Sequence, residues 1–498
     1  MHKFAQLDHA HLWHPFTQMR DWLKREPIVI VAGEGTVLRD VHGCEYLDAN
    51  SSIWTNLHGH NQPRMNAAIQ RQLKKIAHSS ALGLANESAS VLAEKLVELA
   101  NLRFVPEGRA PSRTKASGRR SSSGASPSLA KVFFSDDGST TMEAALKLAH
   151  EFARRTGRSP RPRFLSLEGA YHGDTVGAVS LGHIALFHEA YDGLLFKSDK
   201  VMAPYCYRCP FNRAKPERDD ARQYRQCNWE CADRLERKFS AQKKRGNPYA
   251  AFVFEPLIQG AAGMIPQPAG WLGRTAEIAR AHGAQLIADE VMTGFGRTGC
   301  ARSQISNPTS QILFACHNEG VQPDFLCLAK GMTGGYLPMA ATLTTQSVFD
   351  AFLGEYEEFK TFFHGHSYTA NQLGAAAAIA SLDILQRPAS LRARTRLERA
   401  LCDELKDLWP LPNVGDIRQV GLIAGIELVR DWRTREPFDL RERAGIRVCE
   451  AMAKRGVLTR PVGNIVVIMP PYCTTPTQAR RMVSALRESI EETLPQSG

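Results

Sequence analysis

The stretch LIADEVMTGFGRTG, residues 286–299, decides the fold class of this chain. It opens as an apolar run, ends that run on Asp289 and Glu290, and continues into a glycine-rich turn. Near-continuous apolar runs that alternate with helices are typical of a parallel sheet covered on both faces. The sequence therefore predicts an α/β fold around a large, mostly parallel sheet. The other expected strands are KVFFS (131–135), RFLSL (163–167), AFVFEP (251–256), FLCLAK (325–330) and MAATLT (339–344).

We expect three parts along the chain. A large domain is expected at 55–345 and a smaller α/β domain at 346–498, where 414–429 has the pattern of a short antiparallel pair. An N-terminal segment, 1–54, is expected to pack with the smaller domain. Residues 107–128 are rich in Ser, Gly, Pro and Arg, and such a composition buries too little apolar surface to order itself. We expect a disordered insertion there, and a second inserted surface loop near 303–313.

Composition limits the classes of partner. The net charge is +11 over 498 residues, and part of the excess lies in one basic loop, Arg109 to Arg120. We find no nucleic-acid-binding module, so we expect no nucleic acid partner. No apolar run approaches the ~18 residues of a membrane span, and the N-terminus has no apolar signal region. A cytoplasmic protein with no membrane partner is expected, and its basic charge suits a phosphate cofactor and a carboxylate substrate.

A turn after the first expected strand has the features of a phosphate site. Gly138 and Ser139 lie there, and Thr140 with Glu143 has capping-box spacing, which predicts that a helix starts at Thr140. Free backbone N–H groups and the positive end of the helix dipole favour an anion at such a turn.

Three further residues come just after expected strands. Tyr171, beside glycine, is suited to lie flat on a planar ring. Asp289 would be costly to bury without a partner, and a pyridinium nitrogen is a suitable one. Lys330 follows an apolar run, where burial makes an amine lose its proton and become a nucleophile.

In this order, the four patterns resemble the class III aminotransferases, of the aspartate-aminotransferase-like fold (fold type I of the pyridoxal-phosphate enzymes). The resemblance runs from about residue 11 to 472, and LIADEVMTGFGRTG and LAKGMTGG match best. It implies pyridoxal 5'-phosphate as the cofactor. The roles it implies are Schiff-base formation for Lys330, pairing with the pyridinium nitrogen for Asp289, ring stacking for Tyr171, and phosphate binding for Gly138 and Ser139.

Further motifs resemble the 7,8-diaminononanoate synthase family of biotin biosynthesis. They are HLWHPFTQM (11–19), SSIWTNLHGH (51–60), AYHGDT (170–175), HGHSYTANQLG (364–374) and LTRPVGNIVVIMPPY (458–472). That family converts 8-amino-7-oxononanoate to 7,8-diaminononanoate, with S-adenosylmethionine or L-lysine as amino donor. The resemblance implies a homodimer, because His366 and Ser367 match residues that reach the cofactor phosphate of the neighbouring subunit. It implies that substrate contacts Phe16, Ile53, Trp54, Tyr171 and Gly365, and that Arg460 binds the substrate carboxylate.

Two other functions stay open at this point. One is another class III omega-aminotransferase, of diamine or β-alanine type. Phe16 stands where many family members have tyrosine, and this departure leaves the amino donor open between S-adenosylmethionine and L-lysine. Ornithine and 4-aminobutyrate aminotransferases are disfavoured, because those enzymes carry a second glutamate where this chain has Ala261. The other is a zinc-containing binding protein on a retired scaffold, which the presence of Lys330, Asp289 and Tyr171 disfavours.

Four cysteines lie outside this account. Cys206 with Cys209, and Cys227 with Cys231, form two pairs whose spacing is close to that of a structural zinc site. The alternative is that they are loop thiols with no metal, and we make no metal site part of the expected chemistry.

Overall fold

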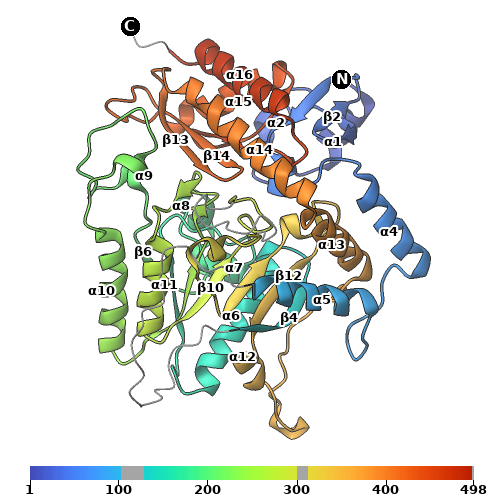
Figure 1. The fold of residues 1–498 in the computed structure, drawn as a ribbon, viewed down its shortest axis with the longest axis vertical. Coiled ribbons are helices and arrows are strands. Elements are labelled where there is room, and N and C mark those ends of the chain that lie inside the picture. The colour runs from blue at the N-terminus through green and yellow to red at the C-terminus, as the bar shows by residue number, and fades with distance from the viewer. Residues whose placement is uncertain (103–127, 300–311, 496–498) are drawn as a thin grey trace.

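A computed structural model describes residues 1–102, 128–299 and 312–495. The two expected insertions, 107–128 and the loop near 303–313, fall almost wholly outside the described residues. A seven-stranded sheet lies at the centre, in the order β4-β12-β11-β10-β7-β5-β6 (Figure 1). Its strands are β4 (Leu129–Ser135), β5 (Arg163–Leu167), β6 (Asp199–Val201), β7 (Tyr249–Phe254), β10 (Gln285–Asp289), β11 (Phe325–Leu328) and β12 (Ala340–Thr345).

The fold class is confirmed, with one correction to the strand directions. The pairs β11–β10, β10–β7, β7–β5 and β5–β6 are parallel. Strand β12, expected from MAATLT as one more strand of a parallel sheet, runs antiparallel to both β11 and β4. Residues 329–339 separate β11 from β12, which is shorter than the crossover of a dozen or more residues that a parallel pair needs. Because β12 is flanked by antiparallel partners, β4 runs in the same direction as β11.

Both faces of this sheet are buried, which explains the near-continuous apolar runs. Successive side chains of a strand point to opposite faces. On one face, Val253 and Ile287 pack against α6 (Gly138–Arg155). On the other, Phe252 and Leu286 pack with α10 (Glu230–Lys244) and α11 (Trp271–Ala281). The other helices near this sheet are α4 (Pro63–Lys75), α5 (Glu87–Ala100), α7 (Val176–Leu181), α12 (Gln346–Asp350) and α13 (Gln372–Leu385).

The C-terminal part builds a separate antiparallel sheet, β13-β14-β17-β16, and the expected antiparallel pair in 414–429 is confirmed. Its strands are β13 (Val414–Val420), β14 (Ile423–Leu428), β16 (Pro461–Val462) and β17 (Ile465–Ile468). The helices α14 (Pro388–Leu405), α15 (Ala444–Lys454) and α16 (Pro476–Thr493) gather beside it in orange and red (Figure 1). The N-terminal strands β1 (Ile30–Glu34), β2 (Val37–Asp40) and β3 (Glu45–Asp48) form a third sheet with β15 (Val457–Leu458), so the N-terminal segment pairs with the C-terminal part of the chain.

Candidate active site

Most of the predicted site residues lie at one edge of the central sheet. Strands β4, β5, β10 and β11 run in the same direction, so their carboxyl ends meet at one edge, the usual ligand position in open α/β sheets. A cavity of about 880 Å³ lies there. Nine of the residues predicted from sequence line it: Phe16, Ile53, Trp54, Gly138, Ser139, Tyr171, Asp289, Lys330 and Arg460.

Lys330 lies just past β11, and its half-buried side chain lines this cavity. Burial lowers the pKa of its amine below the ordinary value, and nearby Asp289 and Glu255 oppose that shift. The lysine Nζ lies 4.6 Å from the ring centroid of Trp54. A buried amine with a lowered pKa is a better nucleophile because more of it is unprotonated.

Asp289 ends β10 and is buried at 5% exposure. Its Oδ2 lies 2.8 Å from Nδ1 of His172, and its Oδ1 accepts a hydrogen bond from the Val291 backbone N–H at 3.1 Å. His172 is itself buried, and its Nε2 has no hydrogen-bond partner among the described residues. His172 stands beside Tyr171 in the motif AYHGDT, yet its pairing with Asp289 comes from tertiary contact across 117 positions.

The turn that was expected to bind phosphate is present, but the residue that caps the following helix differs from the prediction. The sequence predicted a helix start at Thr140 with Glu143 as the capping partner. Instead α6 begins at Gly138, and Asp137 is the N-cap, in a capping box with Thr140. Glu143 accepts hydrogen bonds from the backbone of Gly177 and Ala178 at the start of α7. An Asp cap satisfies the first-turn N–H groups as well as Thr does, so spacing alone did not separate the two.

Two glycines allow close packing at this turn. A Cβ on Gly173 would lie 2.0 Å from the Ser139 hydroxyl, and one on Gly138 would lie 2.8 Å from a Val291 methyl group. The Ser139 Oγ accepts a hydrogen bond from the Asp174 backbone at 2.9 Å. Gly138 and Ser139 line the same cavity as Lys330 and Asp289, so the N-terminus of α6 lies at this cavity.

Aromatic side chains form the walls. The Tyr171 hydroxyl donates to Asp174 Oδ2 at 2.7 Å, and burial raises the pKa of Tyr171, so the hydroxyl stays neutral. Phe16 meets Tyr171 edge to face, with centroids 6.5 Å apart. Trp54 and Ile53 have φ of 68° and 63°, a left-handed conformation that is strained for a β-branched residue. Such strain concentrates at ligand sites, and Trp54 is fixed by a hydrogen bond from its Nε1 to Asn50 at 2.8 Å.

A buried acid that sequence reasoning did not assign completes the cavity. Glu255 follows β7, and burial raises its pKa to about 7. Its Oε2 accepts from the Gly260 backbone at 2.7 Å. Glu290, the second acid of the strand end, instead caps a short helix by accepting from the backbone of Ala315 and Cys316, and burial raises its pKa to about 7. The two acids of LIADE therefore have different tasks.

Three predicted residues do not line this cavity: Gly365, His366 and Ser367. His366 Nδ1 lies 3.3 Å from Asp136 Oδ2, next to the N-cap of α6. The Ser367 carbonyl lies 2.8 Å from Nε2 of His78. Their expected role toward a neighbouring subunit depends on a second chain.

The four cysteines of the two pairs lie in the segment 206–231, between β6 and α10 and at the start of α10. Within residues 1–102, 128–299 and 312–495, no three His, Cys, Asp or Glu side chains group closely enough to hold a metal ion. Burial raises the pKa of Cys206 to about 12 and that of Cys231 to about 11, and the neighbouring thiols of Cys209 and Cys227 raise both further. The Cys227 sulfur accepts a hydrogen bond from Arg225 at 3.0 Å.

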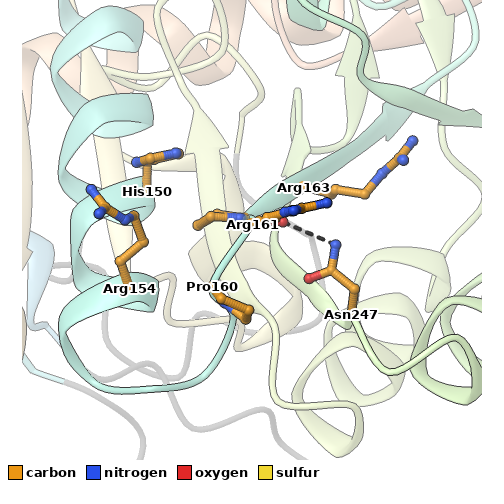
Figure 2. A pocket seen from close by; sticks show the side chains of 7 residues that line it. His150, Arg154, Pro160, Arg161, Arg163 and Asn247 are labelled. Carbon is orange, nitrogen blue, oxygen red and sulfur yellow. Dashed lines mark hydrogen bonds between the residues drawn. The ribbon is translucent and has the colours of Figure 1, made fainter.

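A second hollow, of about 640 Å³, lies at the far end of α6 (Figure 2). Arg154, Arg161 and His150 surround it, and Arg161 is tied through its carbonyl to Asn247 at 3.0 Å. Arg163 is neutralised by Asp199 at 2.7 Å. This second hollow is lined by neither a strand-end acid nor a lysine. The candidate catalytic residues line the cavity of about 880 Å³ instead.

Comparison with known proteins agrees with this site. The family model for class-III aminotransferases matches residues 19–490. The chain therefore belongs to the class III aminotransferases, which are pyridoxal-phosphate-dependent transaminases of fold type I.

Two similar proteins carry the same name, and a third is an amine transaminase. An adenosylmethionine-8-amino-7-oxononanoate aminotransferase of Geobacter sulfurreducens is 45% identical over 97% of this chain and 96% of its own length. The crystal structure of the Methanocaldococcus jannaschii enzyme of that name superposes with a TM-score of 0.83 at 36% identity, covering 98% of this chain and 99% of that one. A PLP-bound amine transaminase from an uncultivated Pseudomonas species superposes with a TM-score of 0.82 at 32% identity, over 97% and 98% of the two chains.

The residues present fit the cofactor. Lys330 is a half-buried amine with a lowered pKa, Asp289 is a buried carboxylate, and Gly138 and Ser139 bring the N-terminus of α6 to the cavity. Together they would supply a covalent anchor, a partner for a protonated ring nitrogen and an anion site, which are the three groups that pyridoxal phosphate needs.

Proposed function

We propose that this aminotransferase transfers an amino group to 8-amino-7-oxononanoate, which gives 7,8-diaminononanoate, with S-adenosylmethionine as the donor. The names of its relatives support this substrate pair. The observation that carries the proposal is Arg460, which lines an otherwise largely apolar cavity. Its Nη2 donates to the Phe16 carbonyl at 2.7 Å, and within the described residues it forms no ion pair with a carboxylate.

The shape of the keto acid matches this arrangement. It has a carboxylate at one end of an apolar chain and the reacting ketone near the other. A guanidinium with free N–H groups gives a bidentate contact to a carboxylate, and Phe16 and Trp54 supply the apolar wall between. Ala261, which also lines the cavity, adds no charge to that wall.

Each protein group has a distinct task in this proposal. Bound pyridoxal phosphate supplies an electron-accepting ring. Asp289 holds a positive charge on the ring nitrogen, and its contact with His172 fixes the carboxylate. Lys330 anchors the cofactor and moves a proton at the substrate carbon next to the amine, which its lowered pKa favours. Tyr171 would stack on the ring, and the Gly138–Ser139 turn would hold the phosphate.

A direct assay tests this function. Purified holoenzyme is mixed with 8-amino-7-oxononanoate and S-adenosylmethionine, and 7,8-diaminononanoate is detected by mass spectrometry. Parallel reactions contain L-lysine as the donor, or 1-phenylethylamine with pyruvate. We expect diamine with S-adenosylmethionine and much slower turnover of the amine–pyruvate pair. Fast amine–pyruvate transfer without diamine would instead establish an omega-aminotransferase, the activity class named for the Pseudomonas neighbour.

We also propose that the active unit is a cytoplasmic homodimer. Two segments meet at the surface, because the His78 ring lies 4.9 Å from the Tyr368 ring and the Ser79 backbone N–H donates to Gln372. Leu82 is 93% exposed there and Tyr368 59%. Such a surface favours contact with a second copy. Across the described ranges, no helix has both the length and the apolar character to span a membrane.

The oligomeric state gives a simple check. Light scattering coupled to size exclusion should show a dimer for the wild type and a shift toward monomer for Leu82→Asp. Leu194→Asp is the matched control, because Leu194 is 67% exposed on a different segment. A monomeric wild type that turns over at full rate would contradict the dimer proposal.

A further inference from the structure

A second arginine lines the cavity, on a wall that the proposed mechanism does not use. Tyr205, Arg208 and Glu427 form this wall, which we call the 205–208/427 wall. Tyr205 and Arg208 also line a neighbouring hollow of about 930 Å³. The wall therefore lies at the margin of the cavity, where space continues beyond the reacting centre.

Arg208 is held in place by a carboxylate. Its Nε donates to Glu427 Oε1 at 2.6 Å, its Nη2 pairs with the same oxygen, and its Nη1 donates to the Arg435 carbonyl at 3.1 Å. A guanidinium has five N–H groups, and these contacts use three. The side chain is 31% exposed and lines the cavity. One face of its guanidinium lies over the Tyr207 ring, 5.2 Å from the ring centroid, which leaves the other face and two N–H groups for a ligand.

The charge on this wall is balanced. Glu427 is buried, and it also pairs with Arg418 and accepts from the Tyr205 hydroxyl. Arg418 has a second carboxylate partner, Asp416, at 3.3 Å. The wall therefore offers N–H donors and a flat guanidinium without a net positive charge.

Arg460 differs in this respect. Its side-chain hydrogen bond goes to a backbone carbonyl, and among the described residues no carboxylate neutralises it. An unneutralised guanidinium attracts a carboxylate, whereas a neutralised one keeps its ability to stack on a flat ring and to donate to uncharged acceptors. The two arginines thus suit different chemical groups.

We propose that the 205–208/427 wall is the contact surface for the nucleoside part of the amino donor. This inference rests on the proposed function, because the keto acid has no such group. An adenine ring and a ribose are uncharged and rich in hydrogen-bond acceptors, which matches Arg208. Pro437, Leu440 and Ile446 line the same cavity and give an apolar surface for the ring. A cavity of about 880 Å³ lies toward the large end of the ~300–1,000 Å³ typical of small-molecule sites, as a cofactor with a nucleoside-bearing donor requires.

The test compares donors in the holoenzyme of an Arg208→Ala variant. The half-reaction is followed by the change in cofactor absorbance as donor is added. We expect the S-adenosylmethionine concentration that gives half the maximal rate to rise about 5- to 30-fold, the effect of losing a hydrogen bond and a stacking contact. The half-reaction with L-lysine or 1-phenylethylamine, which have no nucleoside, should stay within about twofold of wild type, as should the KM for the keto acid. Arg435→Ala is the matched control, because Arg435 donates to the Tyr207 carbonyl of the same loop at 2.8 Å but does not line the cavity.

A binding measurement separates this inference from the function on which it rests. 5'-Methylthioadenosine is titrated into wild type and Arg208→Ala by calorimetry, which needs no turnover. We expect binding to wild type and at least about fivefold weaker binding to the variant. Equal binding to both proteins, or an equal loss for all donors, would overturn the proposal. So would a variant in which only the KM for the keto acid rises, because Arg208 would then be a carboxylate site. Absence of diamine with any donor would contradict the proposed function alone.

Discussion

Replacing Arg460 by alanine should separate the two halves of the reaction. The guanidinium lines the cavity, donates one hydrogen bond to the Phe16 carbonyl at 2.7 Å, and has no carboxylate partner among the described residues. Its remaining N–H groups are therefore available to the keto-acid carboxylate. Loss of a charge-assisted hydrogen bond costs about 1.5–3 kcal/mol, which is roughly a 10- to 150-fold change in an equilibrium or rate constant.

We expect this cost to appear as a higher KM for 8-amino-7-oxononanoate. The donor half-reaction should change much less, because the donor meets the same apolar wall but is also recognised elsewhere in the cavity. Each half-reaction is measured separately by stopped-flow absorbance on the holoenzyme, first with donor alone and then with keto acid added to the aminated enzyme.

Two controls distinguish carboxylate binding from a structural role. Arg460→Lys keeps the charge but loses the planar fork, so its KM should lie between those of wild type and the alanine variant. Arg441→Ala removes an arginine that is 94% exposed and outside the cavity, and it should behave as wild type. Equal losses in both half-reactions of Arg460→Ala would refute the reasoning, because they would mean that the contact with Phe16 merely fixes the cavity wall.

Three further variants test the centre of the site. Lys330→Ala should lose turnover yet keep cofactor through Asp289 and the phosphate turn, as measured by activity and by cofactor content after desalting; wild-type turnover would exclude Lys330 as the anchor. Asp289→Asn should slow the reaction at least ~100-fold, because an amide does not stabilise a charged ring nitrogen, and retention of half the activity would show that Asp289 is structural. Glu255→Gln tests a pH dependence of stability. Burial raises the pKa of Glu255 from 4.5 to about 7. The contribution of the protonated carboxyl to the stability of the fold is therefore full below about pH 4.5 and is lost as the pH rises to about 7. The melting temperature of the variant relative to wild type should therefore be higher at pH 8 than at pH 5, and a pH-independent difference would contradict the assignment.

Local sequence was sufficient for the fold class and the reacting centre. A strand buried on both faces must be apolar throughout, so the runs ending at Asp289 and Lys330 identify strands of a central sheet. A charged residue that ends such a run is costly to bury and therefore carries information about a partner. The position of Tyr171 follows in the same way from the end of β5. Parallel strands bring these ends to one edge, so their convergence could be expected before any contact was known.

Only the tertiary structure determined what each of these groups touches. His172 meets Asp289 across 117 positions, and Arg460 meets Phe16 across 444. The neutralisation of Arg208 by Glu427 spans 219 positions, and it distinguishes a nucleoside surface from a carboxylate site. The direction of β12 and the choice of Asp137 as helix cap were likewise settled by packing. Residue type and spacing report what a side chain can do, whereas its charge state and free hydrogen bonds depend on neighbours that the fold brings from distant parts of the chain.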